Sequence, residues 1–208
     1  MVTSDAERTM NTYLGVSDEF AETEINQSAL ASADWFYVEG YLQTDDRRTA
    51  VVKSAVEFAK QQGVKVCLSL SDPFVAQLFT GNLKSVIGDG VDLIFCNKDE
   101  ALAFTATDSV DQAAKELKAY ATTFVITDGA NGATVFDGDS LSQVPGVKAK
   151  AIDTNGAGDM FAGAFLYAIT SGKSYQKAAQ LANQAAAKVV ERFGPRLKKA
   201  DFDSLKIN

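Results

Sequence analysis

Hydrophobic residues fall into two patterns that alternate along the chain. In residues 45–62 they recur every three or four positions, which predicts a helix with one apolar face. Residues 64–70 and 91–96 are short, mostly apolar runs, which are typical of strands buried within a sheet. By these criteria we expect strands at 9–14, 35–38, 64–70, 91–96, 123–127, 133–136, 141–144 and 147–152. We expect helices at 26–33, 45–62, 101–104, 108–120, 160–169 and 175–193, and one that begins at Pro73 behind the cap Asp72.

This alternation of strand and helix predicts an α/β fold with a mainly parallel, doubly wound sheet covered by helices on both faces. The sequence contains no repeat, low-complexity segment or linker, and one core can be buried at 208 residues, so we expect a single domain, 1–208. The carboxyl ends of parallel strands lie along one edge of a sheet. Asn97 and residues 128–129 and 156–159 follow predicted strands, and we expect them to share one crevice.

Composition narrows the possible partners and the available chemistry. The net charge of −7 argues against a nucleic-acid partner and an anionic membrane surface. We see no membrane span and no signal peptide, and expect a cytoplasmic protein. Histidine is absent, so acid–base chemistry falls to carboxylates. Cys67 and Cys96 lie in apolar runs, which favours buried free thiols over a disulfide or a metal pair.

The segment Asp-Thr-Asn-Gly-Ala-Gly-Asp (153–159) stands between a predicted strand and a helix that is apolar nearly all round. Gly156 and Gly158 allow a ligand to approach the main chain closely. The first N–H groups of a helix lack partners within it, and its dipole favours negative charge there, so this junction predicts an anion site. Asp159 has two interpretations: an ordinary acid that stabilises a helix start, or a base for a hydroxyl that attacks a phosphoryl group.

Two common phosphate-binding motifs do not fit. Residues 172–174 read Gly-Lys-Ser as in a Walker loop, but Tyr167 stands where the first glycine must be. Residues 156–158 begin like a dinucleotide fingerprint, but Phe161 stands where the third glycine belongs. The anion site is therefore neither a P-loop nor a Rossmann turn.

The 153–159 segment resembles the C-terminal signature of the PfkB/ribokinase-like kinases, which phosphorylate sugar and nucleoside hydroxyls. The resemblance implies an ATP-dependent kinase that transfers the γ-phosphate to a nucleoside or sugar. It makes Asp159 the catalytic base, and it places Gly156, Ala157 and Gly158 in the anion hole for the transferred phosphate.

Asn97-Lys-Asp-Glu100 also has two interpretations. Asn as a cap with Glu at the third helical position is a capping box, which needs no ligand. The family resemblance instead implies that Asn97 and Glu100 help to hold a hydrated Mg²⁺ and the nucleotide phosphates. We therefore expect no metal without nucleotide, and Mg²⁺ that enters with ATP.

The remaining site residues also carry a structural and a family interpretation. Residues 127–132 can be a glycine-rich hairpin turn, but Thr127, Gly129 and Gly132 resemble a family stretch that lies along ATP. Asn183 is by pattern a polar residue on a helix face, and by resemblance it lies near the adenine. Asp153 resembles part of a monovalent-cation loop of some members, which implies K⁺ as a further cofactor.

Stretches 71–77, 92–97 and 190–194 look most like the adenosine-kinase branch. Family members carry a further N-terminal block, and the resemblance implies that the lid and first strands are absent here. The chain would then be the C-terminal, nucleotide-binding and catalytic portion of a ribokinase-like domain, either as a fragment or as a truncated gene product. The alternative to a kinase is a catalytically silent nucleotide-binding or interaction protein, in which exposed apolar surface favours oligomers such as a homodimer.

Overall fold

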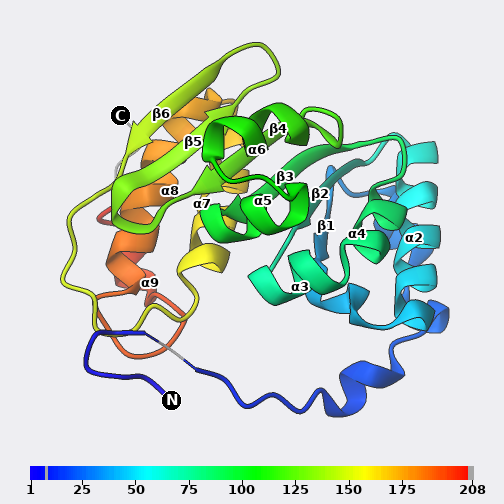
Figure 1. Cartoon of the computed structure of the whole chain (residues 1–208), viewed down its shortest axis with the longest axis horizontal. Coiled ribbons are helices and arrows are strands. Elements are labelled where there is room, and N and C mark those ends of the chain that lie inside the picture. The colour runs from blue at the N-terminus through cyan, green and yellow to red at the C-terminus, as the bar shows by residue number, and fades with distance from the viewer. Residues whose placement is uncertain (8, 206–208) are drawn as a thin grey trace. The chain divides into compact units, whose positions relative to one another are not determined.

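The computed structural model describes residues 1–7 and 9–205 (Figure 1). The chain divides into two compact units. The central unit is Tyr13–Ile126, and the terminal unit combines Met1–Thr12 with Thr127–Asn208. Over the described residues the sheet has six strands in the order β1-β2-β3-β4-β5-β6, which is also their order along the chain.

The central unit consists of strands joined by helices. The pairs β1–β2 and β2–β3 are parallel, with Tyr37 opposite Cys67 and Cys67 opposite Leu93. Val66, Leu68 and Leu93 are fully buried, as expected of apolar runs inside a parallel sheet. The strands are β1 (Trp35–Glu39), β2 (Lys65–Ser69), β3 (Val91–Asn97) and β4 (Ala121–Thr127). The helices are α1 (Gln27–Ala31), α2 (Asp46–Gln61), α3 (Pro73–Leu78), α4 (Thr80–Ile87), α5 (Lys98–Thr105) and α6 (Val110–Leu117), with 3₁₀ turns at Gly15–Glu19, Glu22–Glu24 and Gly40–Thr44.

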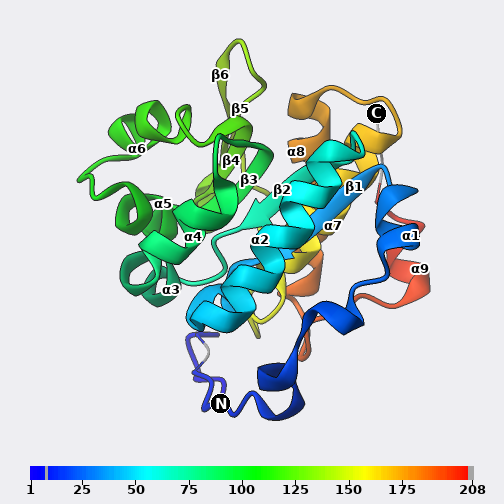
Figure 2. The ribbon, with the colours of Figure 1, turned by 90° about the vertical axis from the view of Figure 1, so that its right-hand side faces the viewer.

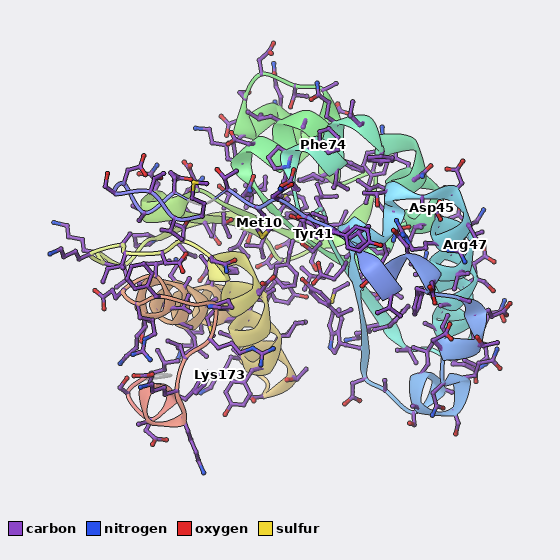
Figure 3. All side chains as sticks on the ribbon, turned by 90° about the horizontal axis from the view of Figure 1, so that it is seen from below. Met10, Tyr41, Asp45, Arg47, Phe74 and Lys173 are labelled. Atoms are coloured by element: carbon purple, nitrogen blue, oxygen red, sulfur yellow. The ribbon has the colours of Figure 1, made fainter. Side chains whose placement is uncertain are left out.

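Helix α2 shows how local sequence sets an element's bounds. The Asp45 carboxylate, at the labelled start of this helix, accepts the N–H of Arg48 at 3.0 Å (Figure 3). Gly63 follows the helix with φ 76°, a left-handed conformation that ends helices. The buried face of α2 packs on β1 and β2 (Figure 2). The predicted amphipathic helix is therefore confirmed.

The terminal unit pairs a hairpin with two long helices. Strands β5 (Gly132–Phe136) and β6 (Leu141–Pro145) are antiparallel and pack on α8 (Tyr175–Val189). Helix α7 (Ala157–Thr170) lies against α8, where Phe165 meets the Tyr175 ring edge-on at a centroid distance of 5.3 Å. The unit also contains the 3₁₀ turn Gly129–Asn131 and the short helix α9 (Lys199–Phe202).

Two predicted strands are absent from these positions. Residues 9–14 and 147–152 form no strand, and every side chain in both segments is exposed. A strand pattern needs a core for its apolar positions, and neither segment has one. In the second segment the N–H of Ile152 donates to the Val190 carbonyl at 2.7 Å, beyond the last residue of α8.

The last long helix is also shorter than predicted, because α8 ends at Val189 and not at 193. The Val190 carbonyl accepts the N–H groups of both Ile152 and Asp153, so it is used outside any helix. Gly194 then has φ 93°, which is outside helical geometry. The sequence pattern missed α9 in the charged tail.

Other expectations are confirmed. The fold is the mainly parallel α/β type predicted, and the remaining long helices lie within a few residues of their predicted bounds. Cys67 and Cys96 are both buried free thiols. Burial, and to a lesser extent the negative charge of Asp92, raises the pKa of the Cys67 thiol to about 12. Burial also raises the pKa of the Cys96 thiol. Across the described part of the chain, no helix is both long enough and apolar enough to cross a bilayer. The division into a single domain stays a prediction.

Candidate functional site

Helix α7 begins at a glycine that no other residue can replace without strain. Gly156 is its cap, with φ 79°. A Cβ atom built on Gly156 would lie 2.5 Å from the Pro195 Cβ and 2.7 Å from the Pro195 carbonyl oxygen. Both the backbone angle and this close approach require glycine. Gly156 is therefore explained by the fold alone, without a ligand.

Gly158 has no such explanation. It occupies the second position of α7, and a Cβ built on it would meet no atom within 4 Å. Glycine inside a helix is less favourable than alanine by roughly 0.5–1 kcal/mol. This glycine therefore leaves open, exposed space beside the first helical N–H groups, at a cost to the helix.

Asp159 is the third residue of α7 and its side chain is exposed. Within the described residues its carboxylate takes part in no hydrogen bond or ion pair. The cap has no side chain to occupy the first-turn N–H groups. The N–H of Ala157 donates to the Thr154 carbonyl at 3.3 Å, whereas the N–H groups of Gly156 and Gly158 have no acceptor among the described residues. The start of α7 thus combines two available donors, open space and an available carboxylate, which suits an anion and a proton acceptor.

Asp153 lies on the same loop but is already engaged. It is 4% exposed, and its two carboxylate oxygens accept the N–H of Asn155 and the N–H of Gly194, each at 2.9 Å. Asp153 therefore joins the loop before α7 to the segment after α8. The cation role implied for Asp153 stays a prediction.

In the central unit, α5 begins with the capping box that the sequence suggested. The Asn97 side chain accepts the Glu100 N–H at 2.8 Å, and Glu100 accepts the Asn97 backbone N–H at 2.9 Å. Asn97 Nδ2 also donates to the other Glu100 oxygen at 2.7 Å. Glu100 is 6% exposed, so these contacts compensate a buried carboxylate.

The metal prediction at Asn97 and Glu100 rests on these two residues alone. Among the described residues, no group of three or more cysteine or acidic side chains could hold a metal ion. The donors available here are carboxylate and amide oxygens, which suit Mg²⁺ that keeps several of its waters.

The terminal unit brings two other predicted residues to the same strand end. A Cβ on Gly132, which has φ 99°, would lie 2.1 Å from the Val144 carbonyl oxygen. Asn183 is 7% exposed, and its Nδ2 donates to the Pro145 carbonyl at 3.1 Å. Both residues thus hold the end of β6, and Asn183 is buried where the helix pattern indicated a polar face.

The other two residues of that stretch lie before Gly132. Thr127 ends β4 and is half-buried, and Gly129 is exposed with φ 52°. Nothing lies within 4 Å of a Cβ built on Gly129, so only its backbone angle requires glycine.

Sequence reasoning missed Pro195, which packs behind Gly156 across 39 positions of chain. The only local signal was the Gly-Pro pair at 194–195, which indicates a turn and names no partner.

We next compared the chain with known protein families, relatives and solved structures. The family model described as "pfkB family carbohydrate kinase" matches residues 1–201. The chain belongs to this pfkB family. The resemblance carried by 153–159 is therefore confirmed.

Among pfkB relatives, the chain is 32% identical to the ribokinase of Lactococcus lactis over 73% of its own length. It is 26% identical to the adenosine kinase of Schizophyllum commune over 92%. The crystal structure of adenosine kinase from Sinorhizobium meliloti superposes with a TM-score of 0.92, at 32% identity over 98% of this chain. The chain spans 50%, 62% and 63% of these three proteins, respectively.

Proposed function

We propose that this chain is the nucleotide-binding and catalytic portion of an ATP-dependent phosphotransferase that acts on a hydroxyl of a nucleoside or sugar. Family membership supports the reaction class, and the named activities of the relatives support both kinds of acceptor. The observation that carries the proposal is the start of α7. There Gly158 leaves open space and the Asp159 carboxylate has no protein partner among the described residues.

In this proposal Asp159 is the catalytic base. It takes the proton of the acceptor hydroxyl, whose oxygen forms a bond to the γ-phosphorus of ATP while the bond from that phosphorus to the β–γ bridging oxygen breaks. ADP leaves with the bridging oxygen. A carboxylate is the available base because the chain has no histidine.

The cap Gly156 and the first two helical residues, Ala157 and Gly158, form the anion hole for the transferred phosphate. The N–H groups of Gly156 and Gly158 are available to it, and the Ala157 N–H shares its proton with the Thr154 carbonyl, 3.3 Å away. These donors are fixed by the backbone, so they need no reorganisation when charge develops on the phosphate oxygens. The positive end of the α7 dipole adds to the attraction.

Thr127, Gly129, Gly132 and Asn183 are proposed to contact the nucleotide, and Asp153 a monovalent cation such as K⁺. Asn97 and Glu100 would hold Mg²⁺ through its waters, since both side chains offer the oxygen ligands that suit this ion. When bound, Mg²⁺ supplies positive charge that neutralises the phosphate oxygens.

Asp159→Asn tests the base assignment. The amide cannot accept the hydroxyl proton, so we expect phosphoryl transfer to fall by at least ~100-fold. ATP binding and the unfolding midpoint should stay nearly unchanged, because Asp159 is exposed and bonded to nothing in its unit. ADP release with adenosine, ribose or fructose as acceptor measures transfer, and calorimetric titration measures binding.

Full transfer by Asp159→Asn would contradict the base assignment. If the unmodified chain binds ATP but transfers phosphate to none of the three acceptors, the silent nucleotide-binding alternative replaces the kinase. Light scattering on the same samples reports whether that form is a homodimer.

A further inference from the structure

The N-terminal segment is bonded to the loop that leads into α7. The Ala6 carbonyl accepts the Thr154 N–H at 3.2 Å and the Thr154 Oγ1 hydroxyl at 3.1 Å. The two residues are 148 positions apart and belong to the same unit. Two donors of one residue thus converge on a single carbonyl.

Ala6 is held in an unusual conformation at this contact. Its φ is 68°, a left-handed angle that costs an L-residue roughly 1–2 kcal/mol. It is also only 3% exposed, although its neighbours on the segment are exposed. A strained, buried alanine between the exposed residues Asp5 and Glu7 indicates that the contact with Thr154 selects its position.

The segment around Ala6 is a closed turn. The N–H of Ala6 donates to the Thr3 carbonyl at 3.0 Å, and the N–H of Thr3 donates to the Glu7 carbonyl at 2.9 Å. The Asp5 carboxylate accepts the Thr3 hydroxyl and the Glu7 N–H, and these bonds lower the pKa of Asp5. The turn therefore presents the Ala6 carbonyl from a defined backbone.

Thr154 passes this contact on to the helix. Its own carbonyl accepts the N–H of Ala157, the first residue of α7, at 3.3 Å. One residue thus connects the N-terminal turn with the start of the helix whose first N–H groups form the proposed anion hole.

We propose that the N-terminal turn, residues 1–7, positions the anion-binding start of α7 through Thr154. Thr154 is a positioning residue, because the contacts that define its role are to Ala6 and Ala157 and not to a ligand. The inference rests on the proposed function for its effect on ATP. Its effect on the loop itself does not depend on that function.

The test compares Thr154→Val with Thr154→Ser. Valine keeps the size and removes the hydroxyl bond to Ala6, whereas serine keeps the hydroxyl. Thr170→Val is the matched control, because the Thr170 hydroxyl bonds Leu166 and Tyr167 at the far end of the same helix. Each variant is measured in the full chain by ATP titration, thermal unfolding and amide hydrogen exchange of residues 155–160.

Thr154→Val should weaken ATP binding by about 2- to 10-fold, the equivalent of one hydrogen bond, and should speed exchange at 155–160. Thr154→Ser should restore both, and Thr170→Val should change neither. The inference is overturned if the valine and serine variants behave alike, or if exchange in Thr154→Val rises throughout the chain. If the unmodified chain binds no ATP while exchange at 155–160 still separates the variants, the proposed function fails and the positioning role stands.

Discussion

Helices α5 and α7 both begin with an acidic residue at their third position, and the two residues are used differently. Glu100 of α5 is buried, and Asn97 donates to both of its oxygens. Asp159 of α7 is exposed and has no partner within its unit. The helix caps differ in the same way, since Asn97 has a side chain that accepts a first-turn N–H and Gly156 has none.

This difference distinguishes a helix start that the protein itself satisfies from one that is available to a ligand. At α5 a side chain and a carboxylate satisfy the helix end, as a capping box does. At α7 the N–H groups of Gly156 and Gly158 and the Asp159 carboxylate have no partner among the described residues and are available to a ligand. An acid at the third helical position that its cap binds is explained by the helix end, whereas one that its cap leaves free needs another explanation.

The largest effect on stability should come from removing the glycine cap of α7. Gly156→Ala should lower the free energy of unfolding by about 3 kcal/mol, because a left-handed alanine costs about 1–2 kcal/mol and the clash with Pro195 adds about 1–3 kcal/mol. Urea denaturation followed by circular dichroism measures it. An unfolding free energy equal to that of the unmodified chain would show that the α7 start is not held as described.

A carboxylate-to-amide change at α5 should have the next largest effect. Glu100→Gln turns an NH₂ group toward one of the two Asn97 donors, so we expect a loss of about 2 kcal/mol in the free energy of unfolding. The same change at α7, Asp159→Asn, should leave that free energy unchanged. If Glu100 also holds Mg²⁺, Glu100→Gln should weaken the response of ATP binding to Mg²⁺ more than it weakens metal-free binding. Equal stability losses in the two variants would remove the distinction between the helix starts.

Features of the two helix starts that depend on neighbouring residues could be predicted from the sequence. Contacts between segments far apart in the chain could not. The spacing of Asn97 and Glu100 predicted the capping box, and the 153–159 motif predicted that Gly156 and Gly158 lie at a helix start. The packing of Pro195 on Gly156 and the bond from Thr154 to Ala6 join distant segments, so no local pattern indicates them.

The two predicted strands that do not form show that a local pattern can also mislead. Residues 9–14 and 147–152 have strand-like composition, but in the fold their side chains meet no core. The spacing of apolar residues shows which face of a segment could be buried. Whether that face is buried depends on whether another element covers it.

Gly158→Ala tests most directly whether the start of α7 is kept open for an anion. Gly163→Ala is its control, because Gly163 lies in the same helix, is exposed, and has no atom within 4 Å of its built Cβ. Both changes should raise the free energy of unfolding by about 0.5–1 kcal/mol, since alanine is the better helix former.

Only Gly158→Ala should impair ATP binding, because its methyl group fills the space beside the first-turn N–H groups. We expect its ATP dissociation constant to rise by at least about tenfold, which is about 1.4 kcal/mol, while that of Gly163→Ala stays unchanged. A stabilised Gly158→Ala that binds ATP as tightly as the unmodified chain would contradict the assignment of this helix start as the anion site.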